Sequence, residues 1–108
     1  MTDLWRLDAT EQARLIRTGA VSSVDLTKAT LARVDAVNPK INAIVDLLAE
    51  DALRDAEAAD RKTRNGEAAG ALHGVPVTGE INGDFKGRAK TKGVGAYQDN
   101  IGKGDNPV

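Results

Sequence analysis

The feature that most constrains this sequence is a change of character near residue 84. Residues 1–84 hold 14 acidic and 10 basic side chains, a net charge of −4, and most of the patterned apolar residues. Residues 85–108 hold 2 acidic and 5 basic side chains, a net charge of +3, together with 5 of the 11 glycines. Because the second stretch has little apolar surface to bury, its ordering entropy is poorly offset. We therefore expect a folded segment over residues 1–84 and a basic, glycine-rich, poorly ordered tail over residues 85–108.

Composition excludes several kinds of protein. The 108 residues contain no cysteine, which excludes disulfides, thiolate metal sites and cysteine nucleophiles. The net charge of −1 gives no general attraction to nucleic acid or to an anionic membrane. No apolar run approaches the roughly 18 residues of a membrane span, and the first residues do not form a signal peptide. We expect a cytoplasmic protein with no cofactor, no metal site, no nucleic-acid partner and no membrane contact.

Local start and stop signals predict three helices. Asp8 is a suitable N-cap for a first helix, which should end before Gly19. Ser22 is a suitable N-cap for a second helix. That helix should end at Asn38, because the residue before a proline is pushed out of the α region. An alanine-rich stripe at helical spacing predicts a third helix from residue 49 to the stop at Asn65-Gly66.

Two short runs predict strands. Residues 41–47 alternate apolar side chains on one face, and residues 74–78 form a short extended run. Pro76 removes a donor from the second run, so this would be an edge strand. The predicted fold class is an α/β fragment of three helices and two short strands, in the order helix-helix-strand-helix-strand, followed by the glycine- and lysine-rich tail.

Several of these runs together carry a resemblance to a known family. Residues 22–26 (SSVDL), residues 31–34 (LARV), residues 38–43 (NPKINA) and above all residues 72–78 (LHGVPVT) resemble the N-terminal region of amidase-signature proteins. The resemblance covers residues 3–87 and, more weakly, residues 88–108. It implies kinship with enzymes that hydrolyse carboxylic amide C–N bonds by a Ser–cis-Ser–Lys triad. Further positions that match the family pattern are Asn82, Asp84, Gly87, Asp105, Pro107 and Val108.

The sequence departs from the family pattern at the residues that matter for catalysis. The family lysine comes directly after the strand, where this sequence has Gly79-Glu80. Lys86 and Lys90 lie beyond that strand and do not obviously replace it. The family serines and their glycine-rich loop come after the last residue of this sequence. The resemblance therefore transfers no catalytic, cofactor-binding or metal-binding residue to this chain.

The remaining candidate residues have ordinary structural interpretations. Ser22 is interpreted as a helix cap and not as a nucleophile, because spacing places no histidine or lysine beside it or Ser23. His73 is the single histidine, so it has no second histidine or cysteine with which to share a metal. Glu80, Asp84 and Asp99 form a weaker candidate for a carboxylate site, because the residues before Asp84 are typical of a turn. Basic side chains stand at every second position from 86 to 92 and would point the same way on an extended chain. We interpret them as a solvated edge in preference to an anion-binding strip. They are Lys86, Arg88, Lys90 and Lys92.

These observations lead to one functional prediction and two alternatives. We expect a truncated or degenerate amidase-family protein, a pseudoenzyme that is not catalytically competent alone. Its open sheet edge should favour self-association or a partner that completes the sheet. The alternatives are a small binding or regulatory module that uses this edge and the basic tail, and one chain of a split amidase whose serines lie on another polypeptide.

Overall fold

The computed structural model describes residues 3–67, 70–80, 101, 102 and 104. The chain divides into two compact units, Met1–Pro76 and Val77–Val108. All the helices of the described residues lie in the first unit. The described residues of the second unit form neither a helix nor a strand. The predicted poor order of residues 85–108 stays a prediction, because nearly all of that tail lies outside the described residues.

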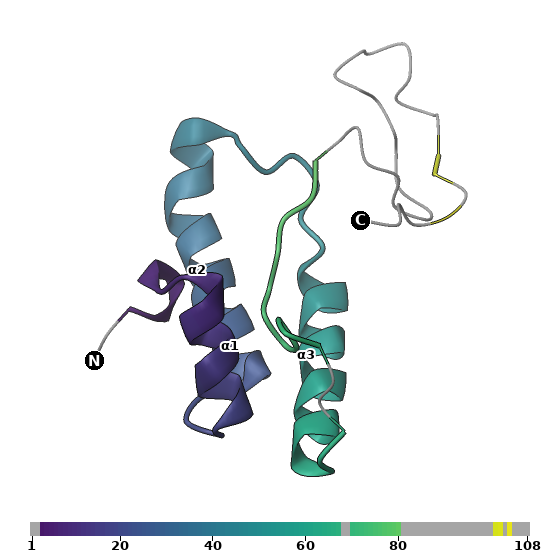
Figure 1. Ribbon diagram of the computed structural model, residues 1–108. Coiled ribbons are helices and arrows are strands. Elements are labelled where there is room, and N and C mark those ends of the chain that lie inside the picture. The colour runs from purple at the N-terminus through teal and green to yellow at the C-terminus, as the bar shows by residue number, and fades with distance from the viewer. Residues whose placement is uncertain (1–2, 68–69, 81–100, 103, 105–108) are drawn as a thin grey trace. The chain divides into compact units, whose positions relative to one another are not determined.

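The first unit is a small helical bundle. It contains a short 3-10 helix and three α-helices, of which α2 and α3 run antiparallel to each other (Figure 1). Helix α2 packs against α3 on one side and against the 3-10 helix η1 on another. The elements are η1 (Leu4–Arg6), α1 (Ala9–Arg17), α2 (Ser23–Ile41) and α3 (Ala49–Arg64).

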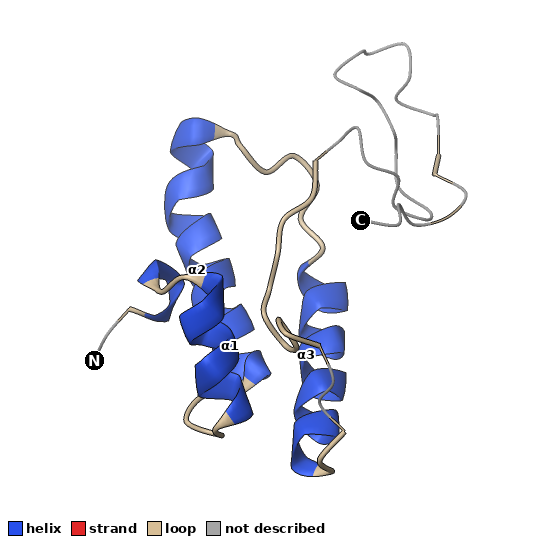
Figure 2. Cartoon of the chain, viewed as in Figure 1, coloured by secondary structure: helices blue, strands red, loops and turns tan. Residues whose placement is uncertain are grey.

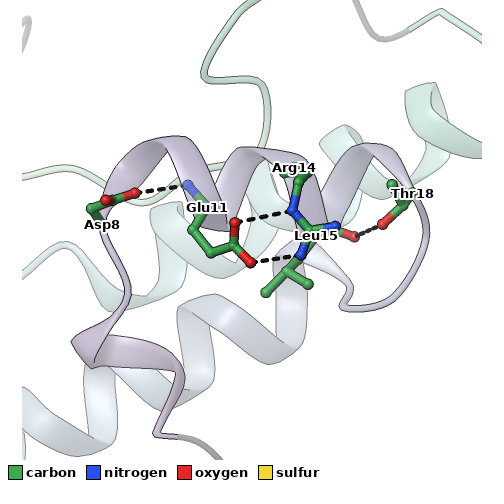
Figure 3. A network of polar contacts seen from close by, with 5 residues as sticks. All are labelled: Asp8, Glu11, Arg14, Leu15 and Thr18. Atoms are coloured by element: carbon green, nitrogen blue, oxygen red, sulfur yellow. Dashed lines mark hydrogen bonds and ion pairs between the residues drawn. The ribbon is translucent and has the colours of Figure 1, made fainter.

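Helix α1 begins where the sequence predicts, at the Asp8 cap (Figure 3). The Asp8 carboxylate accepts the Glu11 backbone N–H at 2.8 Å, which satisfies one free donor of the first turn. The Glu11 carboxylate accepts two hydrogen bonds from Arg14, at 3.0 and 2.6 Å. This hydrogen-bonded pairing lowers the pKa of Glu11 and raises the pKa of Arg14. At the other end of the helix, the Thr18 hydroxyl donates to the Leu15 carbonyl at 3.2 Å.

Three further predicted helix boundaries are confirmed. The Ser22 side chain caps α2 by accepting the Asp25 backbone N–H at 3.0 Å. Gly19 and Gly66 follow the ends of α1 and α3 with φ angles of +76° and +73°. This left-handed conformation is the usual way to close a helix, and glycine adopts it without a steric penalty.

The predicted end of α2 at Asn38 is wrong, because the helix continues through Pro39 to Ile41. Pro39 has no N–H to donate to the carbonyl four residues before it, but it stands in the last turn, so few helical residues follow it. Asn42 then closes the helix with φ +48°, and its N–H donates to the Asn38 carbonyl at 2.7 Å. The Asn38 side chain also pairs with the next segment, donating to the Ile44 carbonyl and accepting the Ile44 N–H, both at 2.9 Å.

The predicted strand over residues 41–47 is also wrong, because of the same extension of α2 and the same pairing of Asn38 with Ile44. Its first residue belongs to α2, and both backbone groups of Ile44 are occupied by the Asn38 side chain. A strand needs those groups for a ladder with another strand. Residues 42–48 instead form a loop that joins α2 to α3 (Figure 2). Val45 and Leu47 are exposed in this loop.

The predicted strand over residues 74–78 is also wrong. Gly74 has φ +79°, outside the strand region, and its carbonyl accepts the Ser23 hydroxyl. The Val75 N–H donates to the Leu72 carbonyl at 3.1 Å within a turn. No strand lies among the described residues, so the α/β prediction is replaced by a mostly helical fold (Figure 2).

The buried core is aliphatic and alanine-rich, in a sequence that has only one Trp, one Tyr and one Phe. Ile16 and Leu26 are its largest fully buried apolar side chains, at 2% and 1% exposed. Several polar side chains are buried beside them, and each buried side-chain nitrogen or oxygen in the described part of the chain has a hydrogen-bond partner. The other buried residues are Ala13 and Ala56, and the polar Gln12, Ser23, Thr27 and Asp60.

Candidate functional site

Both serines of the chain lie at the N-terminus of α2 and are engaged by backbone groups. The Ser22 oxygen accepts the Asp25 N–H, as described above. The Ser23 hydroxyl donates to the Gly74 carbonyl at 2.6 Å, and Ser23 is 1% exposed. A serine nucleophile needs an adjacent base and access to a substrate carbonyl. In the described part of the chain, no side-chain base is hydrogen-bonded to either hydroxyl. The bond from the Asp25 N–H confirms the interpretation of Ser22 as a cap.

A buried carboxylate that sequence reasoning missed stands beside these serines. Asp60, on α3, is 9% exposed and accepts the backbone N–H groups of Ser23 at 2.7 Å and Val24 at 3.1 Å. It therefore caps the first turn of α2 from another helix, and its charge complements the positive end of the α2 dipole. The signal that could have found it is an aspartate four residues after Ala56, on the apolar stripe of α3.

His73 is held against the same helix. Its Nε2 lies 3.0 Å from the Ala59 carbonyl and 3.1 Å from the Thr63 hydroxyl oxygen. Because a carbonyl can only accept, Nε2 is the nitrogen that carries the proton in this contact. This nitrogen is consequently a donor and is not free to act as a base, and the segment around His73 is a turn and not the predicted strand start.

Gly74 is required where it stands. A Cβ at this position would lie 3.2 Å from both Cβ and Oγ of Ser23, and 3.3 Å from Cδ1 of Ile16. Its φ of +79° adds a backbone penalty for any side chain. His73 and Gly74, two residues of the quoted motif LHGVPVT, thus each make contacts that depend on the residue type. We name residues 70–76, which contain them, the strap segment.

Of the three acidic residues proposed as a carboxylate site, the structure describes only one. Glu80 is exposed and belongs to the second unit, whereas Asp84 and Asp99 lie outside the described residues. Residues 3–67, 70–80, 101, 102 and 104 contain no group of three histidine or acidic side chains arranged to hold a metal ion. The carboxylate-site hypothesis is therefore untested, as is the basic strip formed by Lys86, Arg88, Lys90 and Lys92.

A shallow hollow of about 200 Å³ lies between η1, α2 and the loop after α2. At its edge the Arg33 guanidinium sits 4.1 Å from the centre of the Trp5 ring, a cation–π contact that holds η1 on α2. The other lining residues are mainly aliphatic and include no carboxylate and no free nucleophile, so the hollow has no chemistry of its own: Thr30, Val34, Val37, Asn38, Ile41, Ala43 and Ile44.

Fold and site together define a helical segment whose serines and histidine are structural. Comparison with known proteins identifies the family: the Amidase family model matches residues 25–108, and the chain belongs to that family. Within the described residues, no helix has both the length and the apolar character that crossing a bilayer requires.

Several curated proteins are similar to this chain. An indoleacetamide hydrolase of Bradyrhizobium diazoefficiens is 44% identical over 105 residues, which cover 97% of this chain and 20% of that protein. An acylamidase of Rhodococcus erythropolis is 40% identical over 99 residues, covering 92% of this chain and 21% of that protein. A 6-aminohexanoate-cyclic-dimer hydrolase of Paenarthrobacter ureafaciens is 46% identical over 74 residues, covering 68% of this chain and 13% of that protein. The chain thus spans about a fifth of the length of the first two relatives.

Proposed function

We propose that this chain supplies the N-terminal helical part of an amide-hydrolysing protein, and that the 108 residues by themselves do not cleave amides. The relatives named indoleacetamide hydrolase and acylamidase support the reaction class. The family match supports the assignment of the segment. A bundle of this kind contributes to such a protein by holding its neighbouring segments in place, because both of its serines are used in contacts within the bundle itself.

The observation that carries this proposal is the use of the two serines and the single histidine. Ser22 caps α2, Ser23 is buried on the Gly74 carbonyl, and the His73 Nε2 proton is held by Ala59 and Thr63. Freeing the Ser23 hydroxyl would require breaking its part-buried hydrogen bond to the Gly74 carbonyl. The chain therefore has no nucleophile paired with a base at the positions where the described residues could have supplied one.

Position 80 gives independent support for the lack of activity. The amidase resemblance places a lysine there, and this chain has Glu80. A lysine amine can take up and return a proton through a bridging serine, provided that its surroundings lower its pKa. An ionised carboxylate only accepts hydrogen bonds, and it carries the opposite charge. Glu80 therefore cannot reproduce the hydrogen bonds or the charge of that lysine.

A chimeric enzyme tests the proposal. Residues 3–108 of this chain replace the matching N-terminal stretch of the Bradyrhizobium indoleacetamide hydrolase, and ammonia release from indoleacetamide is measured with Glu80 and with Glu80→Lys. We expect hydrolysis only from the Glu80→Lys chimera. Equal activity of the two chimeras would contradict the role given to position 80. Absence of activity from both, with the intact relative active, would contradict the assignment of this segment.

A second function is supported by exposed apolar side chains. Ile41, Val45 and Leu47 are 63%, 65% and 45% exposed, and Leu72 is 50% exposed. Contiguous exposed apolar residues commonly mark an interaction surface. We propose that a second copy of this chain covers them. In sedimentation velocity, the Val45→Ser/Leu47→Ser variant should then associate less than the parent chain. A compact parent monomer at every concentration would count against self-association.

A further inference from the structure

The strap segment is attached to two helices, at two neighbouring points. On α2, the buried Ser23 hydroxyl donates to the Gly74 carbonyl at 2.6 Å. On α3, His73 Nε2 reaches the Ala59 carbonyl at 3.0 Å and the Thr63 hydroxyl at 3.1 Å. The two attachments involve adjacent strap residues, so the direction of the chain at Gly74 is fixed from both sides.

The first attachment depends on a third residue. The Ser23 backbone N–H donates to the Asp60 carboxylate at 2.7 Å, so the residue that holds the strap segment is itself held by α3. Asp60 also follows Ala59, the carbonyl of which receives His73. Both attachments therefore originate from one turn of α3, and a change there would reach the strap segment by both routes.

We infer that Ser23, Asp60 and His73 are positioning residues, which fix the point from which the chain continues toward position 80. Position 80 follows Gly74 by six residues. Each residue of chain spans at most ~3.6 Å, so position 80 lies within roughly 22 Å of Gly74 along the chain, and releasing Gly74 from both helices would free the start of that stretch. The importance of this confinement for catalysis rests on the proposed function, since it is the amidase resemblance that places a lysine at position 80.

The two adjacent serines provide a matched pair of variants. Ser23→Ala removes the hydroxyl that holds Gly74, whereas Ser22→Ala removes one that serves only as a cap of α2. Amide hydrogen exchange of the 108-residue chain is followed by NMR, and the Val75 N–H, which donates to the Leu72 carbonyl, is the reporter. Relative to the slowest amides of α2, we expect Ser23→Ala to speed exchange at Val75 about fivefold and Ser22→Ala less than about twofold.

The second attachment is tested with a conservative replacement. His73→Leu removes the donor, whereas the amide nitrogen of His73→Gln can occupy the place of Nε2. We expect His73→Leu to speed exchange at Val75 as Ser23→Ala does, and His73→Gln to restore most of the protection. This pair keeps the inference testable if Ser23→Ala prevents folding.

A spin label reports on the chain beyond the strap segment. Because the sequence has no cysteine, Val77→Cys gives a single labelling site, and Val77 is 80% exposed. We expect the nitroxide to be more mobile in Ser23→Ala and His73→Leu than in Ser22→Ala and His73→Gln. Equal exchange and equal label mobility across each pair would overturn the inference. These measurements need no catalysis, so an inactive chimera would sink the proposed function without deciding this one.

Discussion

Replacing Asp60 by alanine should destabilise the bundle more than any other single change of a charged residue in the described part of the chain. The carboxylate accepts two backbone N–H groups at the start of α2, and one of them belongs to Ser23, which is 1% exposed. Without Asp60, water cannot replace the acceptor at Ser23, and an unsatisfied buried donor costs about 1–3 kcal/mol. Losing the negative charge at the helix N-terminus adds about 1 kcal/mol.

The expected total is therefore a loss of about 3 kcal/mol in the free energy of unfolding, or roughly 12–24 °C in Tm for a unit of this size. Asp55→Ala is the matched control, since it makes the same replacement on α3 at a side chain that is 79% exposed. Both variants gain the same helix propensity, so their difference isolates the cap.

The assay is urea unfolding followed by far-ultraviolet circular dichroism, which reports on the helices. We expect Asp55→Ala to change the free energy of unfolding by no more than about 0.5 kcal/mol. If Asp60→Ala changed stability as little as Asp55→Ala does, the carboxylate would not be capping α2, and α3 would not be holding Ser23 in place.

Three further predictions follow from the same contacts. Gly74→Ala should cost about 1–3 kcal/mol more than Gly66→Ala, because both positions have positive φ but only a Cβ at Gly74 has close neighbours; thermal unfolding of the two variants checks this. Leu26→Ala should cost about 3–5 kcal/mol by the same measurement, because Leu26 is 1% exposed in the core. The hydrogen bond with Arg14 lowers the pKa of Glu11 below 4.5, so the Glu11 carboxylate stabilises the fold above that pH. The stability difference between the parent and Glu11→Gln should therefore be complete at neutral pH and disappear as the pH falls through the lowered pKa; a difference that grew in acid would contradict the pairing.

The helix boundaries could be predicted from the sequence because caps are local. The Asp8 and Ser22 oxygens each bond a backbone N–H three residues ahead, so the residues that make the contact are visible within one turn. Glycines at positions 19 and 66 close helices by their own backbone conformation. Neither the side-chain caps nor the closing glycines depend on contacts with distant parts of the chain.

The two strands could not be excluded in the same way. Alternating apolar residues over positions 41–47 are compatible with a strand, but a strand also needs a partner for its ladder. The Asn38 amide satisfies Ile44 instead, and nothing in the periodicity of residues 41–47 shows that competition. The prediction of the α2 end failed for a related reason, since the preference of the residue before a proline is weak enough for one helical turn to override it.

The candidate site was only partly predictable because its contacts are non-local. The role of Ser22 follows from its neighbours, but Ser23 meets Asp60 across 37 residues and Gly74 across 51. An aspartate inside an alanine stripe indicates a buried carboxylate without naming its partner. The motif around His73 and Gly74 predicts a strand, whereas the structure has a turn there that these two residues attach to α2 and α3.

The serines and the histidine of the described residues make hydrogen bonds within the bundle, and our central proposal is that these 108 residues alone do not hydrolyse amides. The most direct measurement is ammonia release from indoleacetamide by the purified 108-residue chain, beside the Ser22→Ala/Ser23→Ala double variant and the intact Bradyrhizobium relative. We predict that both forms of this chain release ammonia no faster than buffer, while the relative is active. Sustained ammonia release that scales with the concentration of the parent chain would contradict the claim, whether or not the double variant retained it.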